Sequence, residues 1–519
     1  MPKITFTLLL LLIPVFLSAQ TFERKVLIPP LADRASRYFY VPFEVPTNAK
    51  SISVWYEYDK KGGTNVLDLG VFDSRSSGTN ENVKGFRGWS GGRRNAIFIA
   101  ETAASHGYLA GKIPPGTWRV ILGLYKIAPE GVEVAIKVKI NEIDKNAQQQ
   151  LSEENAKTFV FPETARTAPP VANGYTWFRG DLHMHTFDSD GTWTARGILD
   201  YAAANNLDFV SITDHNTFAH HAEIDRLAPG YKNLLVMRGE EVTTYGGHFN
   251  VWGLPTGELI DFRATPKDAA RINEILRAAT KMGVPASINH PFALCGGCSW
   301  SYGDETWSEF ASVEIWNGSW DFQDEAALKK WDELLRQGKR VTAIGSSDSH
   351  NPPANVDGKV FSIGLPTNFI GAEKLTQKDL FAAIKNSRVW IAENRTFNLS
   401  FAGTVEKSRA TIGGTLFVPA GKPARFEFAG DNFPIGAIVT LISRDGAQQK
   451  ITLDKPNFSE NFTANPTGNN YFRLEIRDAA GKMLAFTNPI YTKTEEARAL
   501  ARAKISNRLS FVRRLRLTT

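Results

Sequence analysis

The sequence of 519 residues contains only two cysteines, Cys295 and Cys298, which excludes a small scaffold held together by several disulfides. It also lacks a strong charge of one sign, because 60 Lys and Arg face 54 Asp and Glu and give a formal net charge of +6. A dedicated nucleic-acid-binding protein usually has a denser basic surface, so no nucleic-acid partner is expected. The 42% of hydrophobic residues excludes a disordered chain, and the length predicts about three domains.

The N-terminus has the order of segments found in a secretory signal. A basic start at Lys3 precedes the apolar run from Ile4 to Phe16, and the small residue Ala19 stands where a signal peptidase would cut. A membrane anchor is the alternative, but the run is shorter than the ~20 residues that span a bilayer. We therefore expect residues 1–19 to be a signal peptide and the mature chain to be exported, as a periplasmic, cell-surface or secreted protein. No later stretch is long and apolar enough to span a membrane, so no transmembrane segment is expected in the mature chain.

Hydrophobic patterning assigns the two ends of the mature chain to β structure. Short alternating runs separated by Gly, Pro and Asn turns predict all-β sandwich domains over residues 21–147 and 396–493. Residues 148–174 are polar and then rich in proline, which is typical of a linker. Residues 494–519 are expected to form a basic helical tail. The sandwiches show no recognisable chemistry, and their aromatic residues are expected to pack the cores rather than to bind carbohydrate.

Between the sandwiches, residues 175–392 alternate between apolar strands and helical stretches. Such alternation predicts an α/β domain built on a parallel sheet or barrel. The expected strands are 177–183, 207–213, 233–238, 248–252, 284–289, 312–316 and 341–346, and helical patterns cover 195–206, 266–282 and 324–337.

Eight of the nine histidines fall within residues 183–350, and most of them stand where a predicted strand ends. Loops that follow the carboxyl ends of parallel strands meet on one face of the fold, where active sites form. Gathered imidazoles and carboxylates are a metal-site composition. The sequence therefore predicts a metal site built from residues at or near the strand ends, namely His183, His185, His215, Glu241, His248, His290, Asp348 and His350.

The spacing within these groups supports a shared site. Because side chains alternate along a strand, His183 and His185 point to the same side and can reach one cation. Asp348 and His350 repeat this spacing at the far end of the domain. Glu241 offers a carboxylate that can bridge two ions ~3.5–4 Å apart.

Other polar residues near these positions have competing interpretations. His220 and His221 fall in a predicted helix and are expected to face solvent rather than to bind a metal. Glu240 is expected to face solvent or to lie behind its neighbour, not to be a ligand. Either Asp188 or Asp190 can fold back from the loop after the first strand.

Six short motifs follow one another within residues 175–392. They are Asp181-Leu182-His183-Met184-His185-Thr186, Ser189-Asp190-Gly191, Thr213-Asp214-His215-Asn216, Gly239-Glu240-Glu241-Val242, His290-Pro291 and Ser347-Asp348-Ser349-His350. In this order they resemble the PHP (polymerase and histidinol phosphatase) superfamily, and most closely its CehA/McbA-like metallohydrolase branch. The resemblance implies a distorted seven-stranded β/α barrel with two or three divalent ions, which are Zn²⁺, Mn²⁺ or Fe.

The resemblance also implies which residues hold each ion. A first ion would be held by His183, His185, Glu241 and Asp348. A second would be held by Glu241, acting as a bridge, with His248 and His290. A third would be held by Asp190, His215 and His350. Asp190 is preferred to Asp188 because it stands in the Ser-Asp-Gly motif of the family.

Clustered divalent ions point to hydrolysis, because they lower the pKa of bound water towards ~7 and stabilise developing negative charge. We expect attack by a metal-bridging hydroxide, with Asp348 and Glu241 as catalytic carboxylates and Asp348 able to receive a proton. The expected substrate is a small anionic or ester-type molecule, and the superfamily resemblance favours a phosphoester. The branch resemblance keeps carbamate, ester or amide hydrolysis as an alternative. A non-catalytic surface binding protein on a PHP-like scaffold is a third hypothesis.

Three more charged residues and both cysteines are candidates for supporting roles. Asp214 either orients a neighbouring ligand or ends a strand in a turn. Arg179 and Arg238 lie near strand ends, where they either contact an anionic substrate or take the packing and surface roles common for arginine. Cys295 and Cys298 are expected to form a disulfide at the mouth of the site, with free thiols as the alternative. The sequence does not indicate an oligomeric state.

Overall fold

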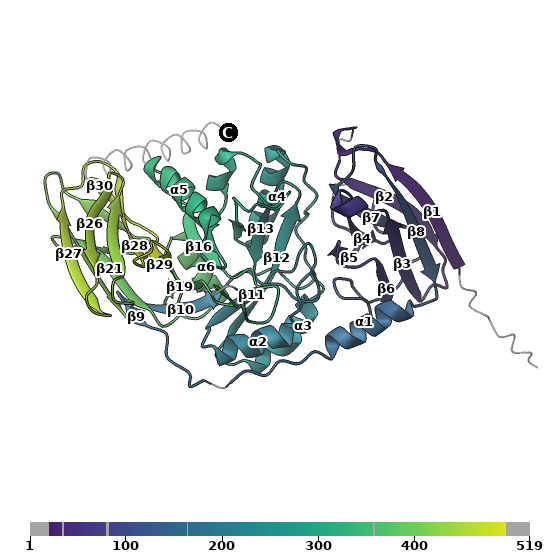
Figure 1. Ribbon diagram of the computed structural model, residues 1–519, viewed down its shortest axis with the longest axis horizontal. Coiled ribbons are helices and arrows are strands. Elements are labelled where there is room, and N and C mark those ends of the chain that lie inside the picture. Colours follow the sequence, from purple (N-terminus) through teal and green to yellow (C-terminus); the bar gives the residue numbers. More distant parts are fainter. Residues whose placement is uncertain (1–19, 34–35, 79–81, 163, 357–358, 495–519) are drawn as a thin grey trace, which may run out of the picture.

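The computed structural model describes residues 20–33, 36–78, 82–162, 164–356 and 359–494. The predicted signal peptide lies outside the described residues, as does nearly all of the predicted basic tail. An N-terminal β domain, a central α/β domain and a C-terminal β domain follow one another along the long axis of the molecule (Figure 1). No helix within the described ranges is long and apolar enough to cross a membrane.

The N-terminal domain consists of two four-stranded antiparallel sheets that share one core. The first has the strand order β1 (Gln20–Ile28), β8 (Val132–Ile140), β3 (Ser51–Tyr58) and β6 (Ala96–Ala100). The second has the order β2 (Tyr38–Val45), β7 (Gly116–Lys126), β4 (Val66–Phe72) and β5 (Phe86–Gly91). Alternation along β8 directs Val134, Ile136 and Val138 into the core, as the sequence pattern predicts.

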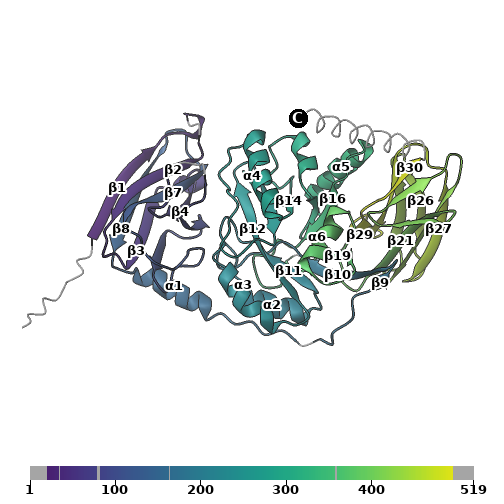
Figure 2. The same cartoon turned by 180° about the vertical axis from the view of Figure 1, so that it is seen from behind.

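The segment predicted to be a linker begins with a helix. Helix α1 (Lys145–Asn155) follows the sandwich directly, and the Asp144 side chain caps it by accepting a hydrogen bond from the Ala147 amide at 2.7 Å. The chain then runs along one edge of the molecule to β9 (Val171–Ala172), which pairs with the first central strand (Figure 2). The sequence pattern missed this helix because only Ala147 and Glu154 of it are buried.

Seven strands of the central domain lie side by side in sequence order. They are β10 (Tyr175–Asp181), β11 (Phe209–Ile212), β12 (Leu235–Thr244), β13 (Gly247–Trp252), β14 (Ala286–Ile288), β15 (Ser312–Asn317) and β16 (Thr342–Ser346). The prediction of parallel pairing is wrong for β13, which is antiparallel to both β12 and β14. Only Tyr245 and Gly246 separate β12 from β13, and two residues make a hairpin, whereas a parallel crossover needs about a dozen or more.

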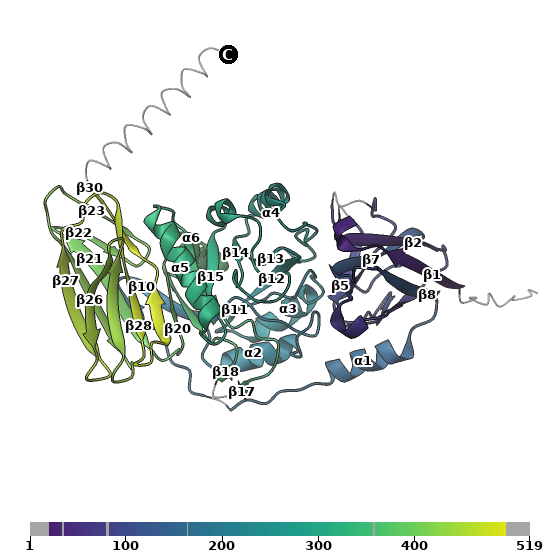
Figure 3. The same ribbon diagram turned by 45° about the horizontal axis from the view of Figure 1, so that its top comes forward.

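Helices pack against the curved central sheet (Figures 1 and 3). They are α2 (Ala195–Ala204), α3 (His221–Leu227), α4 (Ala269–Met282), α5 (Phe322–Arg336) and α6 (Gln377–Lys385). The three predicted helical stretches correspond to α2, α4 and α5. Shorter elements are the 3-10 turns Leu31–Asp33, Lys61–Gly63, Ala228–Gly230 and Asp304–Glu309, and a hairpin of β17 (Ala354–Val356) and β18 (Lys359–Phe361).

The central sheet continues beyond β10 into strands that come later in the sequence. β10 pairs with β19 (Thr367–Ala372), which pairs with β20 (Val389–Ala392). The other edge strand, β16, returns to this side, where the Asn368 side chain accepts from the Gly345 amide at 2.9 Å and donates to the Gly345 carbonyl at 2.6 Å. The fold is therefore mixed α/β with sheet-rich flanking domains, and a seven-stranded barrel stays a prediction.

The C-terminal domain is joined to the central sheet by backbone pairing. β20 pairs with β29 (Met483–Thr487), and the sheet runs on through β28 (Asn470–Arg477) and β25 (Ile438–Ser443) to β26 (Gly446–Thr452). β23 (Thr415–Val418) pairs with β30 (Ile490–Thr494) beside it. A second sheet packs on the same core, in the order β22 (Ser408–Thr411), β21 (Asn398–Val405), β24 (Ala424–Asp431) and β27 (Phe458–Ala464).

The N-terminal domain fits closely against the central domain. The Tyr38 hydroxyl donates to the Phe262 carbonyl at 3.0 Å. Tyr245, in the turn between β12 and β13, places its hydroxyl so near Gly123 of β7 that a Cβ there would lie 1.9 Å from it. Only a glycine at this position leaves room for the tyrosine, so the interface depends on a specific fit rather than on loose contact.

Arg94, between β5 and β6, connects three parts of the chain. Its buried guanidinium binds both carboxylate oxygens of Glu154 on α1, at 3.2 and 2.8 Å, and donates to the Phe187 carbonyl of the central domain at 3.0 Å. An Arg94→Ala change removes the two-point contact of the buried Glu154 carboxylate and leaves it the Gln150 amide at 3.0 Å and the Arg93 guanidinium at 3.9 Å. Loss of a buried partner costs ~3–5 kcal/mol, and the remaining contacts reduce that cost. We expect a lower urea midpoint for this variant and an unchanged one for Lys25→Ala, which breaks an exposed pair with Glu133. Equal midpoints for both variants would contradict the role given to Arg94.

Candidate metal centre

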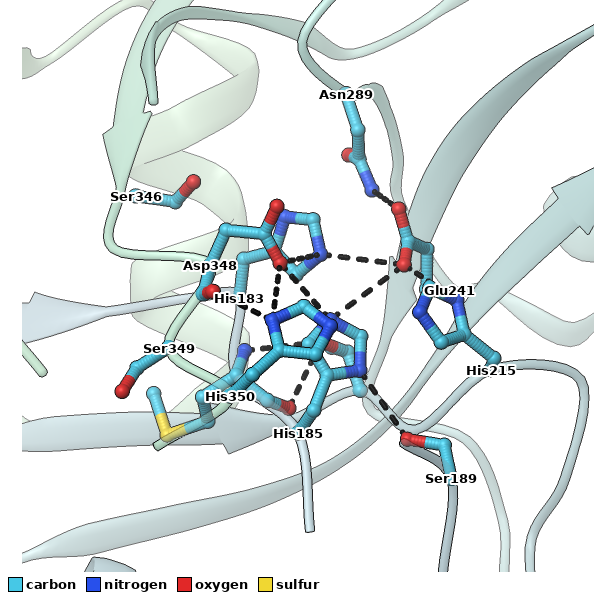
Figure 4. A network of polar contacts seen from close by, with 12 residues as sticks. His183, His185, Ser189, His215, Glu241, Asn289, Ser346, Asp348, Ser349 and His350 are labelled. Atoms are coloured by element: carbon cyan, nitrogen blue, oxygen red, sulfur yellow. Dashed lines mark hydrogen bonds and ion pairs between the residues drawn. The ribbon is translucent and has the colours of Figure 1, made fainter. Parts of the chain in front are cut away.

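All nine residues predicted to hold an ion lie at one end of the central sheet (Figure 4 shows six of them). His183 and His185 follow β10, Asp190 lies in the next loop, His215 follows β11, and Glu241 and His248 belong to β12 and β13. His290 follows β14, and Asp348 and His350 follow β16. The structure thus brings together side chains that are spread over some 170 positions of the sequence.

The side chains of these residues form four overlapping groups, in each of which the ligand atoms lie within 4.8 Å of one another. The groups are His183–His185–Glu241, His183–His290–Asp348, His215–Glu241–His248 and His185–Asp190–His215–His350. Shared members join the groups into one continuous cluster. The cluster therefore offers several positions at which a divalent ion can be held by three or more ligands.

Glu241 occupies the middle of the cluster. Its carboxylate oxygens lie 2.7 to 3.5 Å from ring nitrogens of His183, His185, His215, His248 and His290. The Asn289 side chain donates to its Oε1 at 2.9 Å (Figure 4). A carboxylate that has imidazole nitrogens near each of its two oxygens can bind two ions at once.

Asp348 approaches the same histidines from another side. Its Oδ1 lies 3.2 Å from His183 Nε2 and 3.0 Å from His185 Nε2. Asp348 and His290 have positive φ angles of 49° and 25°, a region that residues other than glycine enter at a cost. The fold therefore directs both side chains into the cluster against their local backbone preference.

Asp190, and not Asp188, joins the cluster. Its Oδ1 lies 3.4 Å from His215 Nε2 and 3.1 Å from His350 Nε2. Asp188 turns instead toward the N-terminal domain and pairs with His106 at 3.0 Å. The geometry thus agrees with the preference that the Ser-Asp-Gly motif indicated.

Opposite charges within the cluster control its protonation. Burial would raise the pKa values of Glu241 and Asp348, but the surrounding histidines hold both well below their usual range. Burial, together with His350 and His215, lowers the pKa of His185 to about 3. Both carboxylates are therefore ionised and His185 is neutral at pH 7. Burial alone would lower the pKa values of His183, His215, His290 and His350, but the neighbouring carboxylates raise all four, that of His350 to about 9. Binding of a divalent ion would therefore release protons from these rings.

Several buried polar atoms of the cluster have no hydrogen-bond partner among the described residues. They include His183 Nε2, Glu241 Oε2 and His290 Nδ1. His183 Nε2 and Glu241 Oε2 lie 3.3 Å apart without a hydrogen bond between them, and a cation held by both atoms would satisfy them. Imidazole nitrogens with carboxylate oxygens form a donor set that suits Zn²⁺, Mn²⁺ or Fe. The residues present therefore fit divalent metal ions.

Glu314 is a residue of the site that sequence reasoning missed. Its Oε1 lies 2.9 Å from His183 Nδ1, and its Oε2 accepts hydrogen bonds from the His290 amide and the Asn317 side chain, both at 3.0 Å. A carboxylate behind a histidine sets the ring orientation and leaves the other nitrogen free for an ion. A signal was present, because Glu314 is the charged residue inside the apolar strand 312–316, and a buried charge needs a partner.

Asp214 supports the loop that carries Asp190. It accepts hydrogen bonds from the Thr186 amide at 2.7 Å and from the Ser189 hydroxyl at 2.6 Å. Ser189 in turn lies 3.4 Å from His185 Nδ1 (Figure 4). Asp214 therefore acts on the cluster through this loop rather than through its sequence neighbour.

Three polar residues near the cluster are buried, which contradicts the expectation for His220 and His221 and excludes the solvent-facing alternative for Glu240. His220 and His221 stand at the start of α3, and their rings lie 3.1 and 3.4 Å from the Gly239 carbonyl. Glu240 lies on the other face of β12 and accepts a hydrogen bond from the Ile260 amide at 2.7 Å. The expectation failed because α3 and the segment around Ile260 pack over β12, a long-range contact that local sequence does not show.

A cavity of about 660 Å³ adjoins the cluster. Seven of the nine cluster residues line it, namely Asp190, His215, Glu241, His248, His290, Asp348 and His350. Cys295 and Cys298, which the structure joins in a disulfide, also line it. Its volume lies within the range of small-molecule sites.

Neither arginine considered as a substrate contact lines this cavity. Arg179 binds the Asp208 carboxylate at 3.3 Å and the Thr167 hydroxyl at 2.9 Å. Arg238 binds the Asp225 carboxylate. The structure therefore gives both arginines packing contacts, which was the alternative interpretation.

The N-terminal domain supplies a second wall of the cavity, which the sequence did not indicate. The wall comes from β4, β5, the turn after β5, and β7, which face the central domain (Figures 1 and 3). Its residues are Val66, Asp68, Trp89, Ser90, Gly91, Gly92, Arg93 and Tyr125. Arg93 is the one Arg or Lys that lines the cavity within the described ranges, and it donates to the Asp190 carbonyl at 2.8 Å.

No protein-family model matches the chain, and no curated protein matches it in sequence. Among solved structures it is similar to a two-domain protein from Bacteroides vulgatus that contains a predicted PHP-like metal-dependent phosphoesterase. The two chains share 19% identity with a TM-score of 0.39, and the match covers 63% of this chain and 100% of that chain. It is also similar to a candidate metal-dependent phosphoesterase from Bifidobacterium adolescentis, at 18% identity and a TM-score of 0.28, covering 39% and 94% of the two chains. An amidohydrolase from Chromobacterium violaceum with bound sulfate and no metal has 17% identity and a TM-score of 0.26, covering 39% and 96%. Likenesses with such low TM-scores carry no argument about the activity of this chain.

Proposed function

We propose that the protein is a metal-dependent hydrolase that acts on a small phosphoester, with Glu241 and Asp348 as its catalytic carboxylates. The observation that carries the proposal is the convergence of nine imidazole and carboxylate ligands beside a cavity large enough for a small molecule. The resemblance of the sequence motifs to the PHP superfamily and its CehA/McbA-like branch adds support. Export of the mature chain belongs to the same proposal and is supported by the composition of residues 1–19.

Two or three divalent ions would be held by the nine cluster residues, divided as the resemblance implies. Such ions, when bound, supply hydroxide at neutral pH and polarise the phosphoryl group that is attacked. Asp348 lines the cavity, where its carboxylate could accept a proton when water attacks. Glu241 would contribute to holding the ions, while Glu314 orients the ring of His183.

A panel of model substrates tests this function. Metal-loaded and metal-stripped protein would be assayed with 4-nitrophenyl phosphate, bis(4-nitrophenyl) phosphate, 4-nitrophenyl acetate and a 4-nitrophenyl carbamate. We expect the loaded protein to hydrolyse the phosphoesters and the stripped protein to hydrolyse none of the four. Faster turnover of the acetate or carbamate would favour the carbonyl alternative, and no turnover with metals bound would favour a non-catalytic binding protein.

Arg93 is placed to attract the anionic group of such a substrate. Its side chain is 22% exposed, and no other Arg or Lys among the described residues lines the cavity. We expect Arg93→Gln to raise KM for 4-nitrophenyl phosphate by about 10-fold, because a charge-assisted contact to the phosphate is lost. Its effect on the uncharged 4-nitrophenyl acetate should be much smaller. An equal rise for both substrates would indicate that Arg93 acts only by holding the loop of Asp190.

A further inference from the structure

Asp68, on β4 of the N-terminal domain, lines the cavity beside the metal centre, and no step of the proposed reaction uses it. We propose that Asp68 accepts hydrogen bonds from hydroxyl groups on the non-reacting part of the substrate. The N-terminal domain thereby selects a polyhydroxylated, sugar-like phosphoester. The inference rests on the proposed phosphoesterase function and adds the substrate class and the residue that recognises it.

One oxygen of the Asp68 carboxylate is held, and the other is open. The Tyr245 hydroxyl donates to Oδ2 at 2.5 Å. Oδ1 has no hydrogen-bond partner among the described residues. It lies beside Gly91 and Gly92, and a Cβ added to these glycines would lie 3.9 Å and 3.6 Å, respectively, from Oδ1. Because these glycines also line the cavity, space is left in front of Oδ1. An acceptor fixed by one partner and open toward the cavity is pre-organised for a donor on a ligand.

Charged residues of the candidate metal centre affect the pKa of Asp68. Burial raises the pKa of Asp68 to about 6, against the opposing effects of the Tyr245 hydrogen bond and of His215, while Asp190 adds to the rise. The carboxylate is therefore mostly ionised at pH 7. Asp68 lines the same cavity of about 660 Å³ as His215, Glu241 and Asp348, so it faces the space that a small substrate held at the ions would occupy.

The remaining walls also suit a polyhydroxylated group. Tyr125 provides aromatic surface, and Asn317 and Gln323 provide amides. Aromatic rings pack against the C–H faces of a sugar ring, while carboxylates and amides bind its hydroxyls. A substrate without donors would leave Oδ1 of the partly buried Asp68 without a donor, so the site would bind it less well than a hydroxylated one.

The contact of Asp68 with Tyr245 crosses the domain interface, so a structural role must be separated from a substrate-binding one. The test uses two esters with the same ring and the same kind of phosphate linkage, cyclohexyl phosphate and myo-inositol 1-phosphate, which differ in their hydroxyl groups. Their kcat/KM values and, by calorimetry, their Kd values would be measured on metal-loaded wild type, Asp68→Asn and Tyr245→Phe. We expect wild type to prefer the hydroxylated ester. Asp68→Asn should reduce that preference by about 10- to 100-fold, because the substrate loses a hydrogen bond to a charged acceptor. Tyr245→Phe, which keeps the acceptor, should keep most of the preference.

Glu57→Gln is the matched control, because Glu57 is an exposed carboxylate on β3 of the same domain. It should leave the rates on both esters and the melting temperature unchanged. The inference is overturned if Asp68→Asn leaves the preference intact, or if Tyr245→Phe reproduces its effect together with an equal loss of melting temperature. If wild type hydrolyses neither ester, the phosphoesterase proposal fails. In that case, calorimetry still decides whether Asp68 selects the hydroxylated ligand.

Discussion

Replacing Glu241 with Gln is expected to lower kcat/KM for 4-nitrophenyl phosphate by about 10²–10³-fold. A loss of this size is typical when one pre-organised electrostatic contact is removed from a reacting centre. Glu241 is the carboxylate that contacts five histidines of the cluster, and it is ionised because those histidines depress its pKa. An amide of the same size keeps the shape but cannot supply the negative charge that holds two cations close together. Metal analysis should therefore show fewer ions per chain than in the wild type.

The adjacent residue provides a closely matched control. Glu240 is buried on the other face of β12, and burial raises its pKa well above the usual range, which favours its neutral form. Glu240→Gln keeps the shape of the side chain and removes no contact to the cluster, so activity and metal content should stay near the wild-type values. If Glu240→Gln lost activity and Glu241→Gln did not, the assignment of the ligand within this pair would be wrong. If neither variant lost activity, the cluster would not be the catalytic centre.

Removing the metal ions is expected to abolish hydrolysis and to lower the melting temperature. Ions that bind the folded chain and not the unfolded one stabilise it by about 4 kcal/mol when their free concentration is a thousand-fold above Kd. Without them, the cluster returns to a set of buried groups of which His183 Nε2, Glu241 Oε2 and His290 Nδ1 have no hydrogen-bond partner among the described residues. The loss should be seen by calorimetry before and after treatment with a chelator.

Re-addition of single metals completes this experiment. Zn²⁺, Mn²⁺ and Fe²⁺ would each be added to stripped protein, and recovery of activity and of melting temperature would be followed together. We expect both to recover with the same ion, because the ligands that stabilise the fold also line the cavity. Unchanged activity and melting temperature after complete removal of metal would contradict the metal-dependent proposal.

Local sequence carried much of the information about the central domain. The apolar runs predicted β10 to β16 in order, and the polar residues after them predicted which side chains meet, because strand ends of one sheet lie on one edge. The His183 and His185 pair followed from the alternation of side chains along a strand. The one error of direction, at β13, arose at a two-residue hairpin inside an otherwise parallel pattern.

Residues whose roles depend on packing between distant segments were predicted less well. His220 and His221 were expected to face solvent, yet α3 packs against β12 and buries them. Glu314 was overlooked because its partner His183 lies 131 positions away. Arg179 and Arg238 stand near strand ends as a substrate contact would, but acidic neighbours on the surrounding elements bind them.

The sequence by itself determined the candidate metal centre of this protein, because strand order and side-chain alternation are local properties that bring its residues to one edge of a sheet. Only the tertiary structure decided what faces that centre. Asp68, Trp89 and Arg93 reach the cavity because the N-terminal domain docks through specific contacts such as Tyr245 against Gly123. Such docking depends on the complementary shapes of two folded surfaces, and no pattern within either segment encodes it.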